Sequence, residues 1–204
     1  MRRSLLGAVF RGLSTTAARA DTALDVQIVQ TASSLEALAV AAYDRVIAQA
    51  AGGDTLMAFA GETRRQHEEH QRAFQAQTVA LDPHARVQDA PNPKFVPLLN
   101  DADLSTPEKL IDFAALLEKV ATDTYLLNLA MLGDTRTKAL MGSVMCVEAQ
   151  HLATLRVARA LPELVAVPDM MKVPTTIGSV AFTAALHQVA GADQIAEPAS
   201  GAVR

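Results

Sequence analysis

Four side chains in two short segments have the types and spacing that metal sites on helices use. Glu148 and His151 stand three residues apart, and so do His67 and His70. On a helix, residues i and i+3 project from one face about one turn apart, so each pair can converge on one metal ion. Both pairs lie among apolar residues at helical spacing, where a carboxylate without a partner is costly to bury. The spacing therefore predicts a metal site.

Proline positions show which elements would carry these pairs, because they leave four long windows without internal proline. Apolar residues recur every three or four positions in each window, which predicts a helix. The expected helices run from about Leu24 to Ala50, from Asp54 to Pro83, from Ser105 to Gly133 and from Asp134 to Leu161. A window of about 25 residues forms a rod of about 38 Å. Four such rods predict an all-α four-helix bundle spanning residues 24–162.

Composition agrees with packed helices and excludes several classes of protein. Half of the 204 residues are apolar but only 4% are aromatic, which favours helices over strands. The net charge is −4 and no dense run of Lys and Arg occurs, so nucleic acid is not an expected partner. No window has the eighteen or so uninterrupted apolar residues of a membrane span. The single cysteine, Cys146, cannot form an internal disulfide and is expected to be a small buried hydrophobic residue.

Residues 1–23 are set apart from the bundle, because the first twenty contain four arginines and no acid. Arg2 and Arg3 before Ser4 resemble a twin-arginine export signal, and Ala18-Arg19-Ala20 resembles a cleavage site. The same composition also fits an organelle transit peptide or a frayed basic terminus. Export is therefore one expectation for localisation, and the cytoplasm is the other.

Two further segments lie outside the four windows. The connection from about Asp82 to Ser105 contains four prolines and a few apolar anchors, namely Phe95, Leu98 and Leu99. A connection of this length within a compact domain usually has a topological reason. Residues 163–204 are expected to form an irregular tail, with a short apolar patch from Val180 to Val189.

The windows also form an internal repeat. In the first and the third window, a tyrosine stands seven residues after a glutamate, as Glu36 with Tyr43 and as Glu118 with Tyr125. His67 follows Glu36 by 31 residues, and Glu148 follows Glu118 by 30. The chain therefore has the pattern of two helical hairpins of one design. A near two-fold arrangement of the hairpins would bring both glutamates and both three-residue pairs to similar heights in the core.

This order of residues resembles that of ferritin-like domain proteins over about Asp25 to Leu161, in particular bacterial ones with a Gln-His-x-Glu-His segment, here residues 66–70. The resemblance implies helices running up, down, down and up, with one long crossover between the second and third. It also implies a site with two ions of iron or manganese. The positions that match the family's ligands are Glu36, His70, Glu118, Glu148 and His151.

His67 departs from the family pattern, which has a glutamate at this position. An imidazole there removes one negative charge and one bridging carboxylate. Three outcomes follow: His67 ligates directly, Glu62 or Glu69 replaces the missing carboxylate, or the second metal binds weakly or not at all. Direct ligation is favoured, because both glutamates lie well off the face that carries His67 and His70.

The alternative to a metal site is that each residue has an ordinary structural role. A lone histidine on an apolar face is usually a hydrogen-bonded core residue, and a lone glutamate usually lies at the solvent edge. Six such residues in register are harder to explain, because a core with three acids and three imidazoles would need compensation. Tyr43 and Tyr125 are expected to be core residues, and we hypothesise that they donate hydrogen bonds to the glutamates.

The expected function is that of a metal-binding protein with a dinuclear iron or manganese centre. The resemblance implies oxidoreductase chemistry on dioxygen, peroxide or ferrous iron. The alternative is a non-enzymatic metal-binding or stress-related structural protein on the same bundle. A cage-forming iron store is less favoured, since no acidic channel motif occurs. The expected partners are metal ions, and a homodimer is compatible with the sequence.

Overall fold

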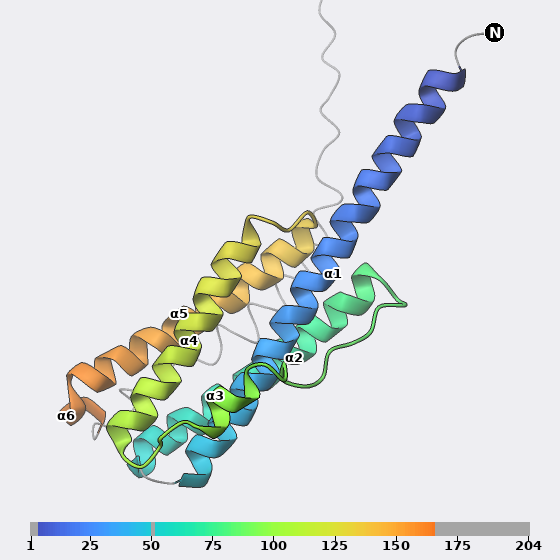
Figure 1. Cartoon of the computed structure of the whole chain (residues 1–204). Helices are drawn as coiled ribbons and strands as arrows, with labels where there is room; N and C mark the ends of the chain where they lie inside the picture. The colour runs from blue at the N-terminus through green and yellow to red at the C-terminus, as the bar shows by residue number, and fades with distance from the viewer. Residues whose placement is uncertain (1–3, 50–51, 166–204) are drawn as a thin grey trace, which may run out of the picture.

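The computed structural model describes the backbone of residues 4–49 and 52–165, and the side chains within residues 21–49 and 52–163. The regular elements in these ranges are all helices, and four of them are long (Figure 1). They are α1 (Ser4–Gln49), α2 (Gly53–Leu81), α3 (Val96–Asn100), α4 (Pro107–Leu129), α5 (Thr135–Ala160) and α6 (Pro162–Val165). The prediction of an all-helical fold is confirmed. In this part of the chain, no helix is long and apolar enough to cross a membrane. The expected apolar patch at residues 180–189 lies outside the described residues.

Two helix starts follow directly from the local sequence. The side chain of Thr106 accepts a hydrogen bond from the Lys109 amide, and Pro107 stands at the first helical position of α4. The Asp134 carboxylate accepts from the Thr137 amide at 2.7 Å and begins α5 as predicted. Both caps satisfy backbone N–H groups that have no partner within the helix.

The other two long helices begin earlier than expected. Gly52 precedes the first residue of α2, and Gly53 has a φ of 70°, a conformation that glycine adopts without steric cost. Asp54, the expected start of this helix, therefore lies in its first turn. α1 begins at Ser4, well before Leu24, because the intervening residues are rich in Ala and Leu and contain no proline.

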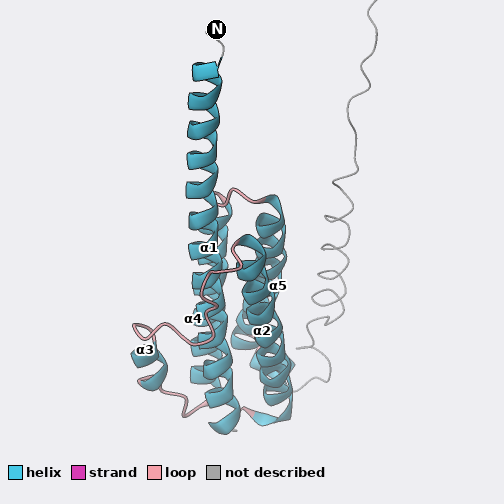
Figure 2. Cartoon of the chain, turned by 90° about the vertical axis from the view of Figure 1, so that its right-hand side faces the viewer, coloured by secondary structure: helices cyan, strands magenta, loops and turns pink. Residues whose placement is uncertain are grey.

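The four long helices pair as two hairpins. α1 packs along α2, and α4 packs along α5, whereas the hairpins meet through α1 with α4 and α2 with α5 (Figure 2). The buried Asp25 of α1 joins the hairpins, because its carboxylate accepts hydrogen bonds from the amides of Gly133 and Asp134 at 2.8 and 2.7 Å. These residues form the turn before α5, so one carboxylate connects both hairpins at the same end.

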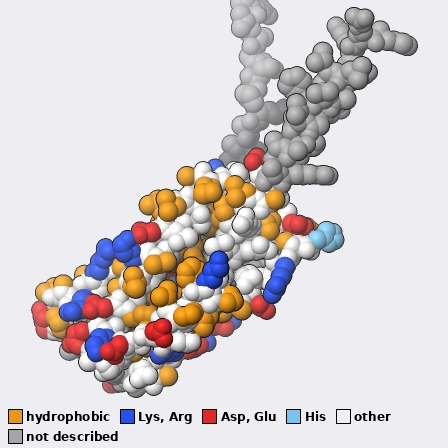
Figure 3. Space-filling view, viewed as in Figure 1, with side chains coloured by type: hydrophobic (Ala, Val, Ile, Leu, Met, Phe, Trp, Pro, Cys, Tyr) orange, Lys and Arg blue, Asp and Glu red, His pale blue; other side chains and the backbone are white. Residues whose placement is uncertain are grey.

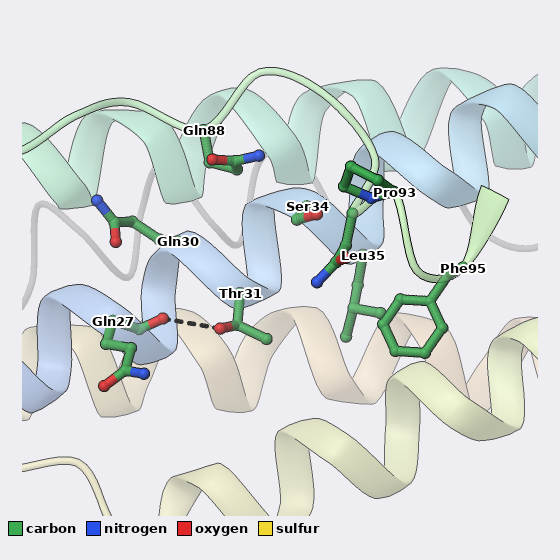
Figure 4. A pocket seen from close by; sticks show the side chains of 9 residues that line it. Gln27, Gln30, Thr31, Ser34, Leu35, Gln88, Pro93 and Phe95 are labelled. Atoms are coloured by element: carbon green, nitrogen blue, oxygen red, sulfur yellow. Dashed lines mark hydrogen bonds between the residues drawn. The ribbon is translucent and has the colours of Figure 1, made fainter.

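The connection between α2 and α4 lies against α1 and contains α3. Its carbonyl groups accept hydrogen bonds from helical side chains, including Ser33 to Gln88 and Gln30 to Arg86, both at 2.6 Å. Figure 4 shows the groove that remains between α1 and this connection. Of the three expected apolar anchors, only Leu99 is buried. Phe95 and Leu98 are 39% and 67% exposed, because the connection is held by hydrogen bonds to its backbone.

The hydrophobic core consists of two large clusters with a polar layer between them, and a small third cluster of Leu38, Ala42 and Leu99. The first apolar cluster includes Tyr43, Val46, Leu56, Phe59, Leu110, Ala114 and Leu155. The second apolar cluster includes Ile28, Val29, Phe74, Ala121, Tyr125, Met141 and Val144. Each long helix contributes residues to both clusters. The middle of each helix, between its contributions to the two clusters, therefore supplies the polar layer.

Candidate metal centre

Six buried carboxylate and imidazole side chains from the four long helices meet in the polar layer. They are Glu36 on α1, His67 and His70 on α2, Glu118 on α4, and Glu148 and His151 on α5. His70 is 8% exposed and the others are at most 1% exposed. The structure thus brings together all six residues singled out in the sequence. Each projects inward from the buried face of an amphipathic helix, which is why the helical periodicity locates it.

The six side chains form two overlapping groups of four. Within each group, one candidate ligand atom per residue lies within 4.8 Å of all the others. The first group consists of Glu36, His67, His70 and Glu148, and the second consists of His67, Glu118, Glu148 and His151. His67 and Glu148 belong to both groups. The arrangement can therefore hold two ions, with the side chains of His67 and Glu148 next to both positions.

His67 lies between the two groups and turns one ring nitrogen towards each. Its Nδ1 is 2.7 Å from Oε2 of Glu36 and 3.6 Å from Oε1 of Glu148, and its Nε2 is 3.2 Å from Oε1 of Glu118. A neutral imidazole has one nitrogen with a free lone pair. A neutral His67 can therefore ligate one ion only, whereas the two oxygens of Glu148 can serve both.

Three buried atoms in these groups lack hydrogen-bond partners, and this fits a metal ion. Nδ1 of His70 and Oε1 of Glu148 are 2.8 Å apart, yet neither makes a hydrogen bond of acceptable geometry. Oε2 of Glu118 has no partner either. Buried polar atoms are costly without partners, and atoms that crowd together without hydrogen bonding have the arrangement of ligands around an ion. Mixed nitrogen and carboxylate donors suit iron and manganese.

The electrostatics of the cluster lower the pKa values of two carboxyl groups. Burial alone would raise the pKa of Glu36, but a hydrogen bond from His67 and the charges of His67 and His70 outweigh burial and lower it to about 2. Burial would also raise the pKa of Glu118, but His67 and His151 outweigh burial and hold this pKa well below its usual range. Both carboxyl groups therefore stay ionised at neutral pH.

The pKa values of the three imidazole groups shift in the opposite direction, upwards. Burial would lower the pKa of His70, but Glu148 and Glu36 raise it to about 9. The pKa values of His67 and His151 are also raised, because nearby carboxylates again outweigh burial. Without metal, protonated imidazoles therefore neutralise the carboxylates. Proton binding can stabilise the cluster in the absence of an ion, an alternative that the sequence did not reveal.

Two buried tyrosines hold the glutamates of α1 and α4 from the opposite hairpin. The Tyr43 hydroxyl donates to Oε1 of Glu118 at 2.5 Å, and the Tyr125 hydroxyl donates to Oε1 of Glu36. Burial and these carboxylates raise the pKa of both tyrosines, so the hydroxyls remain protonated donors. The hydrogen bonds agree with the hypothesis drawn from the sequence. Their crossing between hairpins was not foreseen.

Gln66 is a residue of the site that the sequence did not identify. Its side chain is 4% exposed, and its Oε1 lies 2.5 Å from Nε2 of His151 on the other hairpin. The signal in the sequence was its place in the Gln-His-x-Glu-His segment, directly before His67, and an amide at such a position has many ordinary roles. The contact depends on how α2 and α5 pack, so local spacing did not indicate it.

The structure bears on two other points of the sequence analysis, namely the alternative ligands Glu62 and Glu69 and the burial of Cys146. Glu62 and Glu69 both form ion pairs with Arg65, at 33% and 39% side-chain exposure, and they lie outside both groups of candidate ligands. Neither glutamate lies among the candidate ligands in the structure, and direct ligation by His67, the favoured alternative, remains a prediction. Cys146 is exposed and not buried. The buried face of α5 passes through Val144, Val147 and Glu148, which leaves position 146 on the opposite side.

The chain was compared with protein families, curated proteins and solved structures. A family model described as a ferritin-like domain matches residues 24–160, which is more than half of the chain. No curated protein and no solved structure matches it. The matched range contains all six candidate ligands, both tyrosines and Gln66.

Proposed function

Because the chain belongs to the ferritin-like domain family, we propose that it is a metalloprotein that binds two ions of iron or manganese in the buried cluster. The observation that carries this proposal is the pair of overlapping ligand groups, each with four donors within 4.8 Å of one another. The proposed ligands are Glu36, His67, His70, Glu118, Glu148 and His151.

In this proposal, Glu148 is the ligand shared by both ions. Its Oε1 lies 2.8 Å from Nδ1 of His70 in the first group, and its Oε2 lies 3.3 Å from Nδ1 of His151 in the second. His67 ligates directly through one nitrogen, which is supported by its contacts with both groups and by the outward position of Glu62 and Glu69. The ion that His67 does not ligate then lacks this ligand and is bound more weakly.

The proposed activity is oxidoreductase chemistry on dioxygen, peroxide or ferrous iron. Iron or manganese bound in such a site would supply redox change and open coordination positions. The protein contributes a core from which water is excluded, since five of the six side chains are at most 1% exposed. Tyr43 and Tyr125 orient the glutamates of the two hairpins through hydrogen bonds.

We also propose that the long helices run up, down, down and up, with the connection at residues 82–106 as the crossover. The order of the apolar clusters along each helix supports this direction. α1 and α5 reach the second apolar cluster before the first, whereas α2 and α4 reach the first before the second. The return path of the connection in Figure 1 agrees. The domain limits proposed are residues 1–23, 24–162 and 163–204.

The pKa values of the cluster favour a second candidate function. Protonated imidazoles can neutralise the buried carboxylates without metal. A protein that folds in this state could bind metal reversibly, as a non-enzymatic metal-binding or stress-related structural protein. The two functions differ in one measurable property: an oxidoreductase turns over peroxide or ferrous iron with two ions bound, and a binding protein does not.

The first experiment is elemental analysis of protein purified without added metal. We expect about two ions of iron or manganese per chain, and fewer in both His67→Ala and Glu148→Ala. Glu148→Ala should lose more metal, because Glu148 has an oxygen for each ion. One ion or none in the wild-type protein, with no change in His67→Ala, would contradict a dinuclear site with His67 as a ligand.

The assembly of the protein remains a prediction. Figure 3 shows hydrophobic side chains gathered on the face where α1 and α4 lie in Figure 1. On α4, the exposed apolar residues include Leu116, Val120 and Leu127. A homodimer could bury such a face. Light scattering of the purified protein would measure its mass in solution.

A further inference from the structure

We propose that Gln66 is a positioning residue that determines which ring nitrogen of His151 faces the metal centre. This inference rests on the proposed metal site. It follows from a chain of hydrogen bonds that begins on the surface of α2 and ends at His151 on α5. In this chain, each donor and acceptor is determined by the group before it.

The first step is the ion pair at the surface. Arg65 donates to the two oxygens of Glu62, from Nε at 3.0 Å and from Nη2 at 2.5 Å. Such a two-point contact fixes the plane of the carboxylate more firmly than a single hydrogen bond. An ionised carboxylate only accepts hydrogen bonds, so any further partner of Glu62 must be a donor.

The second step sets the orientation of the Gln66 amide. Its Nε2 donates to Oε1 of Glu62 at 3.2 Å, because the NH₂ group is the only part of the amide that a carboxylate can accept from. The amide oxygen therefore points in the other direction, where it lies 2.5 Å from Nε2 of His151. An amide oxygen only accepts, so Nε2 of His151 must carry the hydrogen.

The third step concerns the other nitrogen of the ring. A histidine that ligates a metal is neutral and carries one N–H, so in the metal-bound protein a hydrogen on Nε2 leaves the lone pair of His151 on Nδ1. Nδ1 lies 3.3 Å from Oε2 of Glu148 and 3.5 Å from Oε2 of Glu118, the two carboxylates of the second group. The amide of Gln66 thus directs the lone pair of His151 towards the second ion.

The first group has no equivalent of this contact. In the internal repeat, His67 corresponds to Glu148, so the residue that corresponds to Gln66 is Val147. Valine has no side-chain atom that can accept a hydrogen bond, and it cannot orient His70 as Gln66 orients His151. We therefore infer that Gln66 acts on one of the two ion positions only.

The test uses Mn²⁺ titration by calorimetry of the full chain and three variants. Gln66→Leu removes the acceptor at similar size. The double variant Glu62→Gln with Gln66→Glu exchanges amide and carboxylate, so an acceptor for His151 and a hydrogen bond between positions 62 and 66 are both restored. The control is Gln71→Leu, which alters an amide on the same helix that binds only the carbonyl of Asp89.

Gln66→Leu should lower the affinity of one Mn²⁺ site about 10- to 100-fold and leave the other unchanged. The double variant should recover the affinity to within a few-fold, and Gln71→Leu should equal the wild type. A merely structural role would not predict this recovery. Circular dichroism shows whether each variant folds, and the double variant still tests the inference if Gln66→Leu does not.

Nitrogen NMR of histidine-labelled protein loaded with Zn²⁺ gives a second readout. We expect His151 to carry its hydrogen on Nε2 in the wild type, and this hydrogen should exchange faster with solvent in Gln66→Leu. Wild-type affinity in Gln66→Leu, or Zn²⁺ bound through Nε2 of His151, would overturn this inference alone. A wild-type protein that binds neither Mn²⁺ nor Fe²⁺ would instead overturn the proposed function, and the Nε2 hydrogen in metal-free protein would still report the contact with Gln66.

Discussion

The two hairpins of the bundle share one plan but differ in charge at the centre. In each, the first helix places a glutamate in the polar layer, with a tyrosine seven residues later that reaches across to the other hairpin. In each, the second helix supplies two residues at i and i+3. These are Glu148 and His151 in the α4–α5 hairpin, but His67 and His70 in the α1–α2 hairpin. The two hairpins thus have similar backbones but supply different candidate metal ligands.

This difference shows how one substitution can change a symmetric site. With a carboxylate at both positions, the cluster would contain four acids and two imidazoles, and the metal-free core would carry excess negative charge. With His67, three acids face three imidazoles, and proton binding can balance the charge. In the proposed dinuclear site, we therefore expect the histidine at position 67 to favour the metal-free protein and to weaken one of the two ion positions. The predictions below test these two consequences.

The largest effect is expected from making the hairpins alike with His67→Glu. The new carboxylate adds a negative charge and a second oxygen, so the affinity for the second ion should rise at least about tenfold, or about 1.4 kcal/mol. The metal-free variant should be less stable than the wild type, because a fourth buried acid has no imidazole to neutralise it. Calorimetric titration with Mn²⁺ and thermal melts with and without metal measure both effects.

His67→Gln is the matched control, because it removes the imidazole without adding charge. It should weaken metal binding and lower the stability of the metal-free protein. Equal metal affinity in His67→Glu and His67→Gln would argue that charge at this position does not limit binding of the second ion.

The next largest effect is expected in how stability depends on pH, which should differ between the metal-free and the metal-bound protein. In the metal-free protein, the pKa of His70 is raised from 6.5 to about 9, so its contribution to stability is complete below pH 6.5 and is lost as the pH rises through about 9. The pKa of Glu36 is lowered from 4.5 to about 2, so its contribution is present above pH 4.5 and is lost as the pH falls through about 2. Stability without metal should therefore be greatest between about pH 4.5 and 6.5.

Above pH 6.5, metal should have a stabilising effect that increases with pH. An ion competes with protons for the imidazole nitrogens, so metal binds more tightly as the pH rises. Between pH 6.5 and 9, the melting temperature should fall in chelator-treated protein, while the increase in melting temperature on adding Mn²⁺ should grow. A metal-free protein whose stability is constant over this range would contradict charge balance by the histidines.

A smaller effect is expected from the crossed tyrosines. Tyr43→Phe and Tyr125→Phe each remove one hydrogen bond to a buried carboxylate, which should cost about 1.5–3 kcal/mol of unfolding free energy. Because the two tyrosines occupy equivalent positions, the two costs should be similar in metal-free protein under urea. Unequal costs would indicate that the charge difference between the hairpins extends to the glutamates of α1 and α4.

The smallest effect is expected at the surface of α2. Glu69 is 39% exposed and pairs with Arg65, outside both groups of candidate ligands. Glu69→Gln should therefore change metal content little and alter stability by less than about 1 kcal/mol. Elemental analysis of this variant beside His67→Gln separates the two explanations for the missing carboxylate. A loss of metal in Glu69→Gln would mean that Glu69 moves into the site.

Much of this architecture is encoded locally, and the sequence alone was enough to predict it. Four proline-free windows with apolar residues every three or four positions indicated four long helices, because the helical repeat is a property of one segment. The same repeat placed the six candidate ligands on buried faces, and the seven-residue spacing of Glu36 with Tyr43 matched that of Glu118 with Tyr125. The caps at Thr106 and Asp134 follow from the same local rules.

What only the tertiary structure decided are the contacts between helices. The crossing of Tyr43 to Glu118, the sharing of Glu148 by two groups, and the hydrogen bond from His151 to Gln66 depend on the separation and rotation of packed helices. Helical periodicity shows which face of a helix is buried, but not which atom of a neighbouring helix lies opposite. For the same reason, the charge balance of the cluster became visible only when the imidazoles and carboxylates could be placed within a few ångströms of one another.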